Sequence, residues 1–443
     1  MLRKLHVLVL VISSLAITVT TSRAEEKTAR APAEPPKTLA SAQTKASPPP
    51  PDAAHARAVF ETKFDDYKAA LRGIEKLQTE YQTADASERE KINQSMVARV
   101  TQAQSLVDAM VAAAEDVYRA SPNTDPHITG LLSDVAEYET IGRQIGRGIP
   151  SPRNPDDVYY PIDGGDQYEK ALPIIKLLID GGAKDKELYV WGFLCAFATN
   201  DYDLAKTYLA QVKATGALQP IADAAARGER ADSQAGLMKT VLQTMSGFFS
   251  NLDEYRELWA NESKIRADEA KANDLPRVKL TTTKGDITLE LFENQAPQTV
   301  ANFVTLVKQG FYNGSPFHRV LPEFMAQAGA KTDEGNGGPG YNIRDEMDRP
   351  DFRRHFRGSV SMANTGEPNS ADSQFFINFI PTPHLNGRHT VFGRVIGGMD
   401  VLAKLQHRSP SHEMNPPKPD RILKAEVIRE RPHPYKFDKI KGE

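Results

Sequence analysis

The period of the apolar pattern changes near Asp274, and this change constrains the fold more than any other feature of the sequence. Before Asp274 apolar residues recur at spacings of three and four, which is typical of helices with one buried face. After Asp274 apolar and polar residues alternate, as in strands that bury one side. We therefore predict a multidomain chain, with an all-α helical domain over residues 56–273, a β-rich domain over residues 274–430 and a tail at 431–443.

Charge and cysteine content exclude several classes of function. The 55 Lys and Arg residues are offset by 58 Asp and Glu residues, and this lack of a basic excess argues against a nucleic-acid partner. Cys195 is the only cysteine, so an intramolecular disulfide and a zinc site of several thiolates are both excluded. We expect Cys195 to be a buried core residue, and we expect neither a metal nor a cofactor.

The first 24 residues have the organisation of a secretory signal peptide. Arg3 and Lys4 precede an apolar run from Leu5 to Val19, and Ser22-Arg23-Ala24 follows it. Residues 25–55 form a Pro- and Ala-rich linker, which holds seven of the 30 prolines. We expect an exported chain in a bacterial periplasm or cell envelope, soluble after cleavage after Ala24. An uncleaved leader, the less favoured alternative, would be its only contact with a membrane.

The helical domain begins with a predicted antiparallel hairpin. Its apolar faces are formed by Phe60, Phe64, Tyr67, Leu71, Ile74 and Tyr81, and by Ile92, Met96, Val100, Ala103, Val107, Met110, Ala114 and Val117. A third helix is expected around Ile128 and Leu131, and a last one from Leu237 to Trp259. That last helix continues into the charged run Asn261–Lys271, which we interpret as a solvated face.

A weak internal repeat lies in the middle of the helical domain. Tyr168-Glu-Lys-Ala171 and Tyr202-Asp-Leu-Ala205 are 34 residues apart, the period of tetratricopeptide repeats. Phe193 stands where that pattern requires glycine. The alternatives are one and a half repeat-like hairpins, whose surface would suit a protein partner, and a generic helical bundle, which we favour.

Short strands follow Asp274. Val278 and Leu280, then Ile287 and Leu289, alternate with polar residues across a turn at Lys284-Gly285-Asp286. Pro297 begins a short helix that Gly310 ends. Further strands are predicted at Phe317–Leu321, Val360–Met362, Gln374–Phe379, Thr390–Val395 and Ile422–Ile428. This pattern predicts a closed antiparallel β-barrel with two helices.

Five sequence blocks in this domain resemble those of the cyclophilins. They are Phe317-His318-Arg319-Val320, Phe324-Met325-Ala326-Gln327, Ser361-Met362-Ala363-Asn364, Ser373-Gln374-Phe375-Phe376-Ile377 and the run Leu385–Gly393. They occur in the family's order, and the resemblance covers about Val278–Val427. It implies a cyclophilin-like eight-stranded barrel capped by two helices and peptidyl-prolyl cis–trans isomerase activity on proline-containing polypeptides. It does not extend to the helical domain.

The resemblance also implies a set of site residues. Arg319 is the expected catalytic residue. The expected substrate-binding residues are His318, Phe324, Met325, Gln327, Ala363, Asn364, Gln374, Phe376, His384, Leu385 and His389. His384 departs from the pattern, because cyclosporin-sensitive relatives have Trp there, and we expect a weaker grip on that drug.

The chemistry of the reaction fits an arginine. Rotation about an X–Pro bond faces a barrier of about 18–20 kcal/mol and breaks no bond, so neither a nucleophile nor a metal is needed. A twisted bond exposes the nitrogen lone pair, to which a permanently charged guanidinium can donate. We therefore predict an isomerase that assists the folding of exported proteins. The alternatives are a scaffold that binds proline peptides and a chaperone module, each with little turnover.

Overall fold

The computed structural model describes residues 52–145, 165–219, 234–410 and 416–441. The expected signal peptide and most of the linker lie outside these ranges. The chain divides into two compact units, the first ending at Leu132 and including Asp180–Ala183, the second made of Ser133–Ile179 and Lys184 onward. Among the described helices, none is long and apolar enough to cross a membrane.

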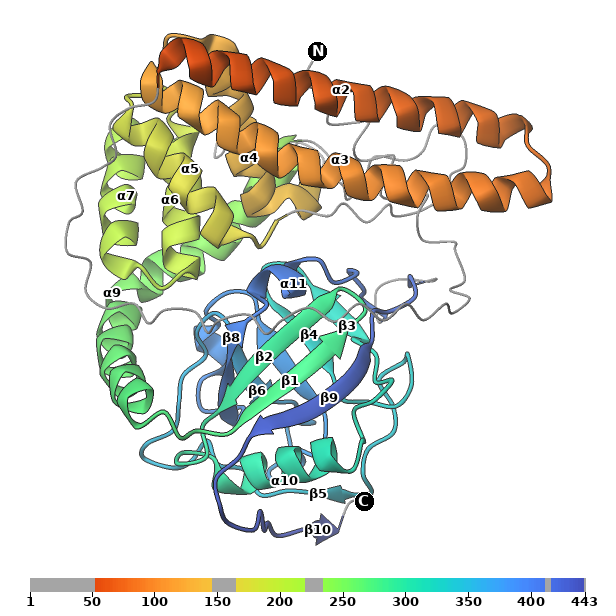
Figure 1. The fold of residues 1–443 in the computed structure, drawn as a ribbon. Coiled ribbons are helices and arrows are strands. Elements are labelled where there is room, and N and C mark those ends of the chain that lie inside the picture. The colour runs from red at the N-terminus through yellow and green to blue at the C-terminus, as the bar shows by residue number, and fades with distance from the viewer. Residues whose placement is uncertain (1–51, 146–164, 220–233, 411–415, 442–443) are drawn as a thin grey trace. The chain divides into compact units, whose positions relative to one another are not determined.

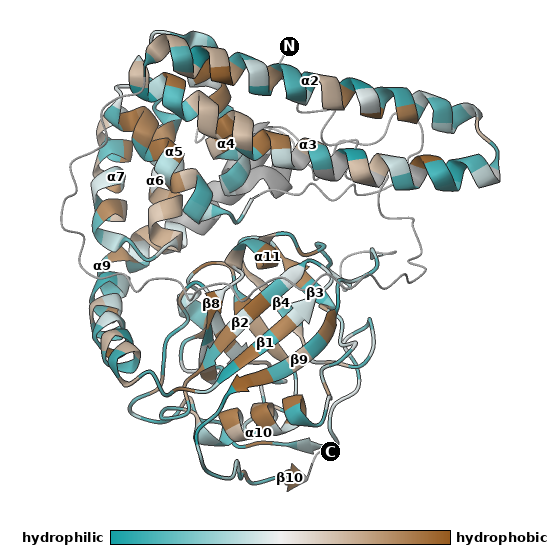
Figure 2. Ribbon diagram, in the orientation of Figure 1, coloured by the Kyte–Doolittle hydropathy of each residue, from teal (hydrophilic) through white to brown (hydrophobic). Residues whose placement is uncertain are grey.

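The first unit contains the predicted helical hairpin. Helices α2 (Ala53–Thr83) and α3 (Ala86–Ala120) run antiparallel, followed by α4 (Pro126–Ile145), which continues into the second unit (Figure 1). Asp85 begins α3 with a capping box, in which its side chain accepts from the Glu88 backbone and Glu88 accepts from that of Asp85. The buried residues of α2 include four of the predicted six: Phe60, Tyr67, Leu71 and Ile74. Figure 2 shows hydrophobic and hydrophilic residues mixed along both helices, as one buried face requires.

The second unit begins with helices α5 (Tyr168–Asp180), α6 (Glu187–Ala198), α7 (Tyr202–Thr215) and the long α9 (Gln234–Ala272). The two tyrosines of the weak repeat each begin a helix, α5 and α7, and both are buried. Helix α6 is apolar on every side and buried from Val190 to Ala198, so it is the centre of this helical layer. Cys195 is buried there as predicted, and burial raises the pKa of its thiol to about 12.

The β-rich part is one curled antiparallel sheet, as predicted. Its strands follow the order β3-β4-β7-β6-β8-β2-β1-β9. Their bounds are β1 Arg277–Thr282, β2 Gly285–Leu291, β3 Arg319–Leu321, β4 Met325–Ala328, β6 Ser359–Met362, β7 Phe375–Asn378, β8 Val391–Gly397 and β9 Ile422–Arg429. The backbone before β3 meets the start of β9, where Phe317 N donates to Asp420 O at 2.8 Å and Ile422 N to Ser315 O at 2.9 Å. These bonds close the curl of the sheet.

Two helices lie at opposite ends of this sheet (Figure 1). Helix α10 (Pro297–Lys308) buries Val300, Phe303 and Val304, and Gly310 follows it with φ +68°, the left-handed conformation that favours glycine there. Helix α11 (Met399–Ala403) follows β8. The short strands β5 (Tyr341–Asn342) and β10 (Ile440–Lys441) form a second sheet, which ties the predicted tail to the domain.

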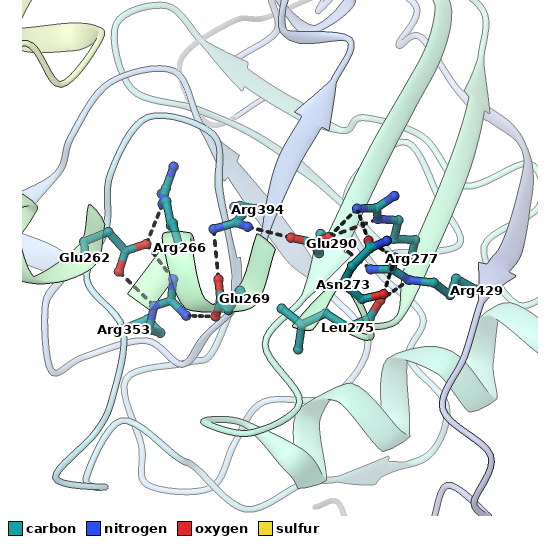
Figure 3. A network of polar contacts seen from close by, with 10 residues as sticks. All are labelled: Glu262, Arg266, Glu269, Asn273, Leu275, Arg277, Glu290, Arg353, Arg394 and Arg429. Atoms are coloured by element: carbon teal, nitrogen blue, oxygen red, sulfur yellow. Dashed lines mark hydrogen bonds and ion pairs between the residues drawn. The ribbon is translucent and has the colours of Figure 1, made fainter. Parts of the chain in front are cut away.

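The charged run Asn261–Lys271 is the predicted solvated helix face only in part, because most of its residues are exposed but two acidic residues are buried. Glu262 and Glu269 of α9 are 5% and 8% exposed, because they pair with Arg353 and Arg394 of the β-rich part. Arg394 in turn pairs with Glu290 of β2 (Figure 3). The run therefore holds α9 against the sheet by buried ion pairs, whose partners are too distant in the sequence for its local pattern to reveal.

Candidate functional site

Strand register places three of the predicted site residues, Arg319, Gln327 and Phe376, in one row. Arg319 of β3 lies opposite Gln327 of β4, Gln327 opposite Phe376 of β7, and Phe376 opposite Ser361 of β6. Paired residues of neighbouring strands point to the same face of a sheet, so these four side chains share one face. The adjacent row Val320, Ala326, Ile377 and Val360 is fully buried in the core of the sheet. Met325 and Gln327, two residues apart, also share a face.

Within the described ranges Arg319 has no carboxylate partner. Its guanidinium carbon lies 5.7 Å from the centroid of the Phe324 ring, and no acidic group among the described residues is within ion-pair distance. Partial burial lowers the pKa of the guanidinium, but an arginine remains charged at neutral pH. The row thus holds a cation whose N–H groups are not committed to an acid.

Apolar and aromatic groups surround this cation. Met325 and Phe376 are 1% and 4% exposed, and they form the apolar floor of the row. The Phe324 ring stacks on the His384 ring, with centroids 5.7 Å apart. His384 and the half-buried Leu385 belong to one turn of 3-10 helix, Pro383–Leu385. The site therefore has an apolar surface beside a charged hydrogen-bond donor.

The polar edge of the site is formed by a chain of amides. Gln327 Nε2 donates to Gln374 Oε1 at 3.1 Å, and Gln374 Nε2 donates to Gly335 O at 3.1 Å. Ala363 N donates to Gln374 O, so the Ala363 N–H is not free for a substrate. In the described part of the chain the backbone N–H and C=O of Asn364 have no hydrogen-bond partner, which leaves them free for an extended peptide.

The histidines of the site are held in the neutral form. Burial lowers the pKa of His389, whose Nδ1 lies 3.0 Å from Met362 O, and its ring contacts that of Phe376 at 5.2 Å. Burial also lowers the pKa of His384. His318 does not join the row: it is 5% exposed, packs against Gly335, and has its pKa lowered to about 4 by burial.

Three residues that support the site were not singled out by the sequence analysis. The His355 ring is parallel to that of Phe376 at 5.9 Å, and burial lowers its pKa to about 3. Asn386 Oδ1 accepts from His355 N at 2.9 Å and lies 3.0 Å from His355 Nδ1. Tyr255 of α9 donates its hydroxyl to His355 O at 3.2 Å. Asn386 lies inside a block that resembles the family, but no local signal marks Tyr255.

A second helical segment reaches the loop that carries Phe324. Asp166 Oδ1 accepts from Glu323 N at 3.0 Å, and Glu323 has φ +52°, a conformation that a non-glycine residue adopts rarely. Arg357 pairs with Glu169 at 2.6 Å and donates to Asp166 O at 2.7 Å. The residue before Phe324 is therefore fixed by contacts from the helical part of the same unit.

The arrangement offers a charged donor, an apolar floor and free backbone groups for an extended chain. Within the described ranges no three His, Cys, Asp or Glu residues lie together as a metal site would require. The row can thus hold an apolar ring and stabilise negative charge or a lone pair beside it. It contains no pair of groups arranged as nucleophile and base.

The sheet domain of this chain is similar to known proteins. Residues 277–427 fit the family model described as "Cyclophilin type peptidyl-prolyl cis-trans isomerase/CLD". A peptidyl-prolyl cis-trans isomerase of Helicobacter pylori is 46% identical over 147 residues, which are 32% of this chain and 89% of that protein. The peptidyl-prolyl cis-trans isomerase-like 1 protein of Gibberella zeae is 42% identical over 156 residues, 34% of this chain and 95% of that protein. A crystal structure of a cyclophilin-type isomerase from Cryptosporidium parvum aligns with a TM-score of 0.33 and 32% identity, covering 35% of this chain and 99% of that one.

Proposed function

Because the chain belongs to the cyclophilin-type peptidyl-prolyl cis–trans isomerases, we propose that the row around Arg319 isomerises X–Pro bonds in exported polypeptides while they fold. The activity itself follows from the family. The roles of individual residues and the exported clients are our proposal.

The observation that carries the residue assignment is the position of Arg319. It lies on the same sheet face as Gln327 and Phe376, beside an apolar floor, with no acidic partner in the described part of the chain. As the X–Pro bond twists, conjugation is lost and the nitrogen lone pair becomes an acceptor. A guanidinium held beside a dry surface stabilises that twisted state electrostatically. The donor must keep its proton to stabilise the lone pair, and the guanidinium of Arg319 does so at neutral pH.

The remaining residues position the substrate in this proposal. Phe376 and Met325 contact the proline ring, and Phe324 with Leu385 closes its sides. The free N–H and C=O of Asn364 pair with the backbone of the extended client, and Gln327 donates to a client carbonyl. His389 closes one edge as a neutral ring.

The role in export rests on the amino-terminal sequence. A charged start, an apolar run and a small-residue exit are typical of a chain that leaves the cytoplasm, and the Pro-rich linker would separate the folded part from the envelope surface. Slow X–Pro isomerisation limits the folding of many proteins, so an isomerase outside the cytoplasm would act on clients as they arrive.

The test is the refolding of an exported protein whose folding is limited by an X–Pro bond. The full chain should accelerate refolding, Arg319→Ala should abolish the acceleration, and Arg319→Lys should restore little, because a point charge lacks the rigid fork of donors. A reporter fused to residues 1–55 should be recovered outside the cytoplasm. Acceleration that is unchanged in Arg319→Ala would remove Arg319 from the mechanism.

The main alternative is a scaffold that binds proline peptides with little turnover. His384 favours it, because a smaller ring replaces the indole of cyclosporin-sensitive relatives beside Phe324. Tight peptide binding by the full chain with no acceleration of isomerisation would establish this alternative instead.

A further inference from the structure

A cavity of about 590 Å³ lies between α9 and the sheet domain, at the edge of the candidate site that His384 forms. One wall is formed by Gly247 and Glu254 of α9, and the other by Phe352, Arg354, His384 and Asn386. Gly247 and Glu254 lie outside residues 277–427, so this wall is an addition of the present chain to its isomerase domain.

The cavity adjoins the proposed proline pocket at His384. His384 lines the cavity and stacks its ring on Phe324, whose ring lies beside Arg319. Asn386 lines the cavity and hydrogen-bonds to His355, whose ring is parallel to that of Phe376. A chain bound with its proline on Phe376 can therefore continue past His384 into the cavity.

Arg354 contributes a positively charged guanidinium to the lining of this cavity. Its guanidinium carbon lies 3.6 Å above the centroid of the Phe352 ring, which fixes its plane. Its Nη1 is buried and has no hydrogen-bond partner among the described residues. Buried donors in native proteins are almost always paired, and an unpaired guanidinium nitrogen calls for an acceptor oxygen. Glu254 lines the same cavity, but no ion pair joins it to Arg354 within the described ranges.

The wall that faces Arg354 is held in place. Arg353, the neighbour of Arg354, forms ion pairs with Glu262 at 2.6 Å and Glu269 at 2.5 Å, both on α9 (Figure 3). Tyr255, one residue after Glu254, donates to His355 O. The helix and the loop 352–357 therefore form one surface, which is organised before any client binds.

We propose that this cavity is a subsite for the client segment that flanks the X–Pro bond, and that Arg354 selects an acidic side chain there. The inference rests on the proposed function, because it extends the same peptide beyond the proline pocket. Helix α9 then takes part in substrate selection. A short proline peptide that ends before the cavity does not contact this subsite, so its affinity does not depend on it.

The test uses the full chain and two sets of peptides at neutral pH. A short peptide contains one Ala-Pro bond and little else, and longer peptides carry the same bond with one Asp, or one Asn as its control, at successive positions on either side. Affinity is measured by fluorescence anisotropy and kcat/KM by the isomerisation assay. We expect one Asp position to bind about tenfold more tightly than its Asn control, the factor that a charge-assisted hydrogen bond is typically worth.

Two charge variants should shift this preference in opposite directions. Arg354→Gln should remove the preference for Asp over Asn, because the guanidinium is lost. Glu254→Gln should increase it by about threefold, because a nearby like charge is removed from the cavity. A preference for Asp that persists in Arg354→Gln, or equal binding of Asp and Asn peptides at every position by the unmodified chain, would overturn the proposal.

A steric variant supports the same test without changing charge. A Cβ built at Gly247 meets no atom within 4 Å, so Gly247→Leu fits the helix and fills the cavity. It should lower the ratio of kcat/KM for the long peptide to that for the short one, whereas Ala260→Leu, at an exposed position of α9 that does not line the cavity, should not. If the short peptide is not turned over, the proposed function is refuted but this inference is not. The anisotropy measurement still shows whether the cavity prefers Asp over Asn.

Discussion

Arg353 and Glu262 form a two-point ion pair across 91 residues of sequence, with Nε donating to Oε2 at 2.8 Å and Nη2 to Oε1 at 2.6 Å. Their side chains are 2% and 6% exposed. A buried pair is costly to break, since removal of one partner leaves the other charge without compensation. This contact therefore joins the long helix of the helical part to the isomerase domain, and any fragment that begins at Asp274 would leave Arg353 and Arg394 without Glu262 and Glu269.

We predict that Arg353→Met destabilises the junction by about 3 kcal/mol, because the buried Glu262 and Glu269 each lose one ion pair and keep only Arg266 and Arg394 as partners. Urea unfolding followed by the fluorescence of Trp259, in a Trp191→Phe background, reports on α9 beside this junction. Lys271→Met is the matched control on the same helix. Its partner Asp268 and Lys271 itself are both more than three-quarters exposed, so its loss should cost less than about 1 kcal/mol. Equal effects of the two substitutions would contradict the importance of the buried pair.

The sheet followed from local pattern, whereas the site residues were implied by the resemblance of five sequence blocks to a family. Alternation predicted two strands joined by a turn at Lys284-Gly285-Asp286, and in the structure Val278 pairs with Leu289 and Leu280 with Ile287. The five blocks carried the residues of the Arg319 row, because a strand fixes which of its side chains share a face. The contacts between the helical part and the sheet domain were not predicted from the sequence. Glu262 and Glu269 look solvated in a charged run, and Tyr255 meets Asn386 across 131 residues.

Turnover should be independent of pH between about 7 and 9. The guanidinium of Arg319 stays protonated throughout this range, and the pKa values of His318, His384 and His389 are all lowered by burial, so these rings are already neutral at pH 7. The measurement is kcat/KM for an Ala-Pro peptide, with the uncatalysed rate subtracted at each pH. A tenfold change per pH unit in this range would instead indicate a general acid or base.

Acid should destabilise the isomerase domain through His355. Burial lowers the pKa of this ring to about 3 in the folded protein, whereas an unfolded histidine titrates near 6.5. Above pH 6.5 both states are neutral and His355 contributes no pH dependence. Below it only the unfolded state takes up the proton, so stability falls with a slope of up to about 1.4 kcal/mol per pH unit. His355→Asn should reduce that slope between pH 6.5 and 5.

The slope, not the absolute stability, is the quantity to compare, because the smaller side chain also loses packing. Phe356→Leu is the control, since it removes buried ring area but no titratable group. It should therefore keep the slope of the unmodified chain. His318, whose pKa is lowered to about 4, contributes in the same direction and accounts for part of the slope that remains. An unchanged slope in His355→Asn would show that this histidine is not neutral in the folded state.

His384 should determine sensitivity to cyclosporin. Its ring stacks on Phe324 at 5.7 Å, but it is smaller than an indole and covers less of the pocket edge. We predict that the full chain binds the drug weakly and that His384→Trp raises its affinity at least about tenfold, through added aromatic contact and an indole N–H donor. Isothermal titration measures both proteins, and His384→Phe separates the two causes because it restores ring area without the donor. If His384→Trp binds no better than the unmodified chain, the block on the drug lies elsewhere, and the loop 333–341 with its glycines is the next segment to exchange.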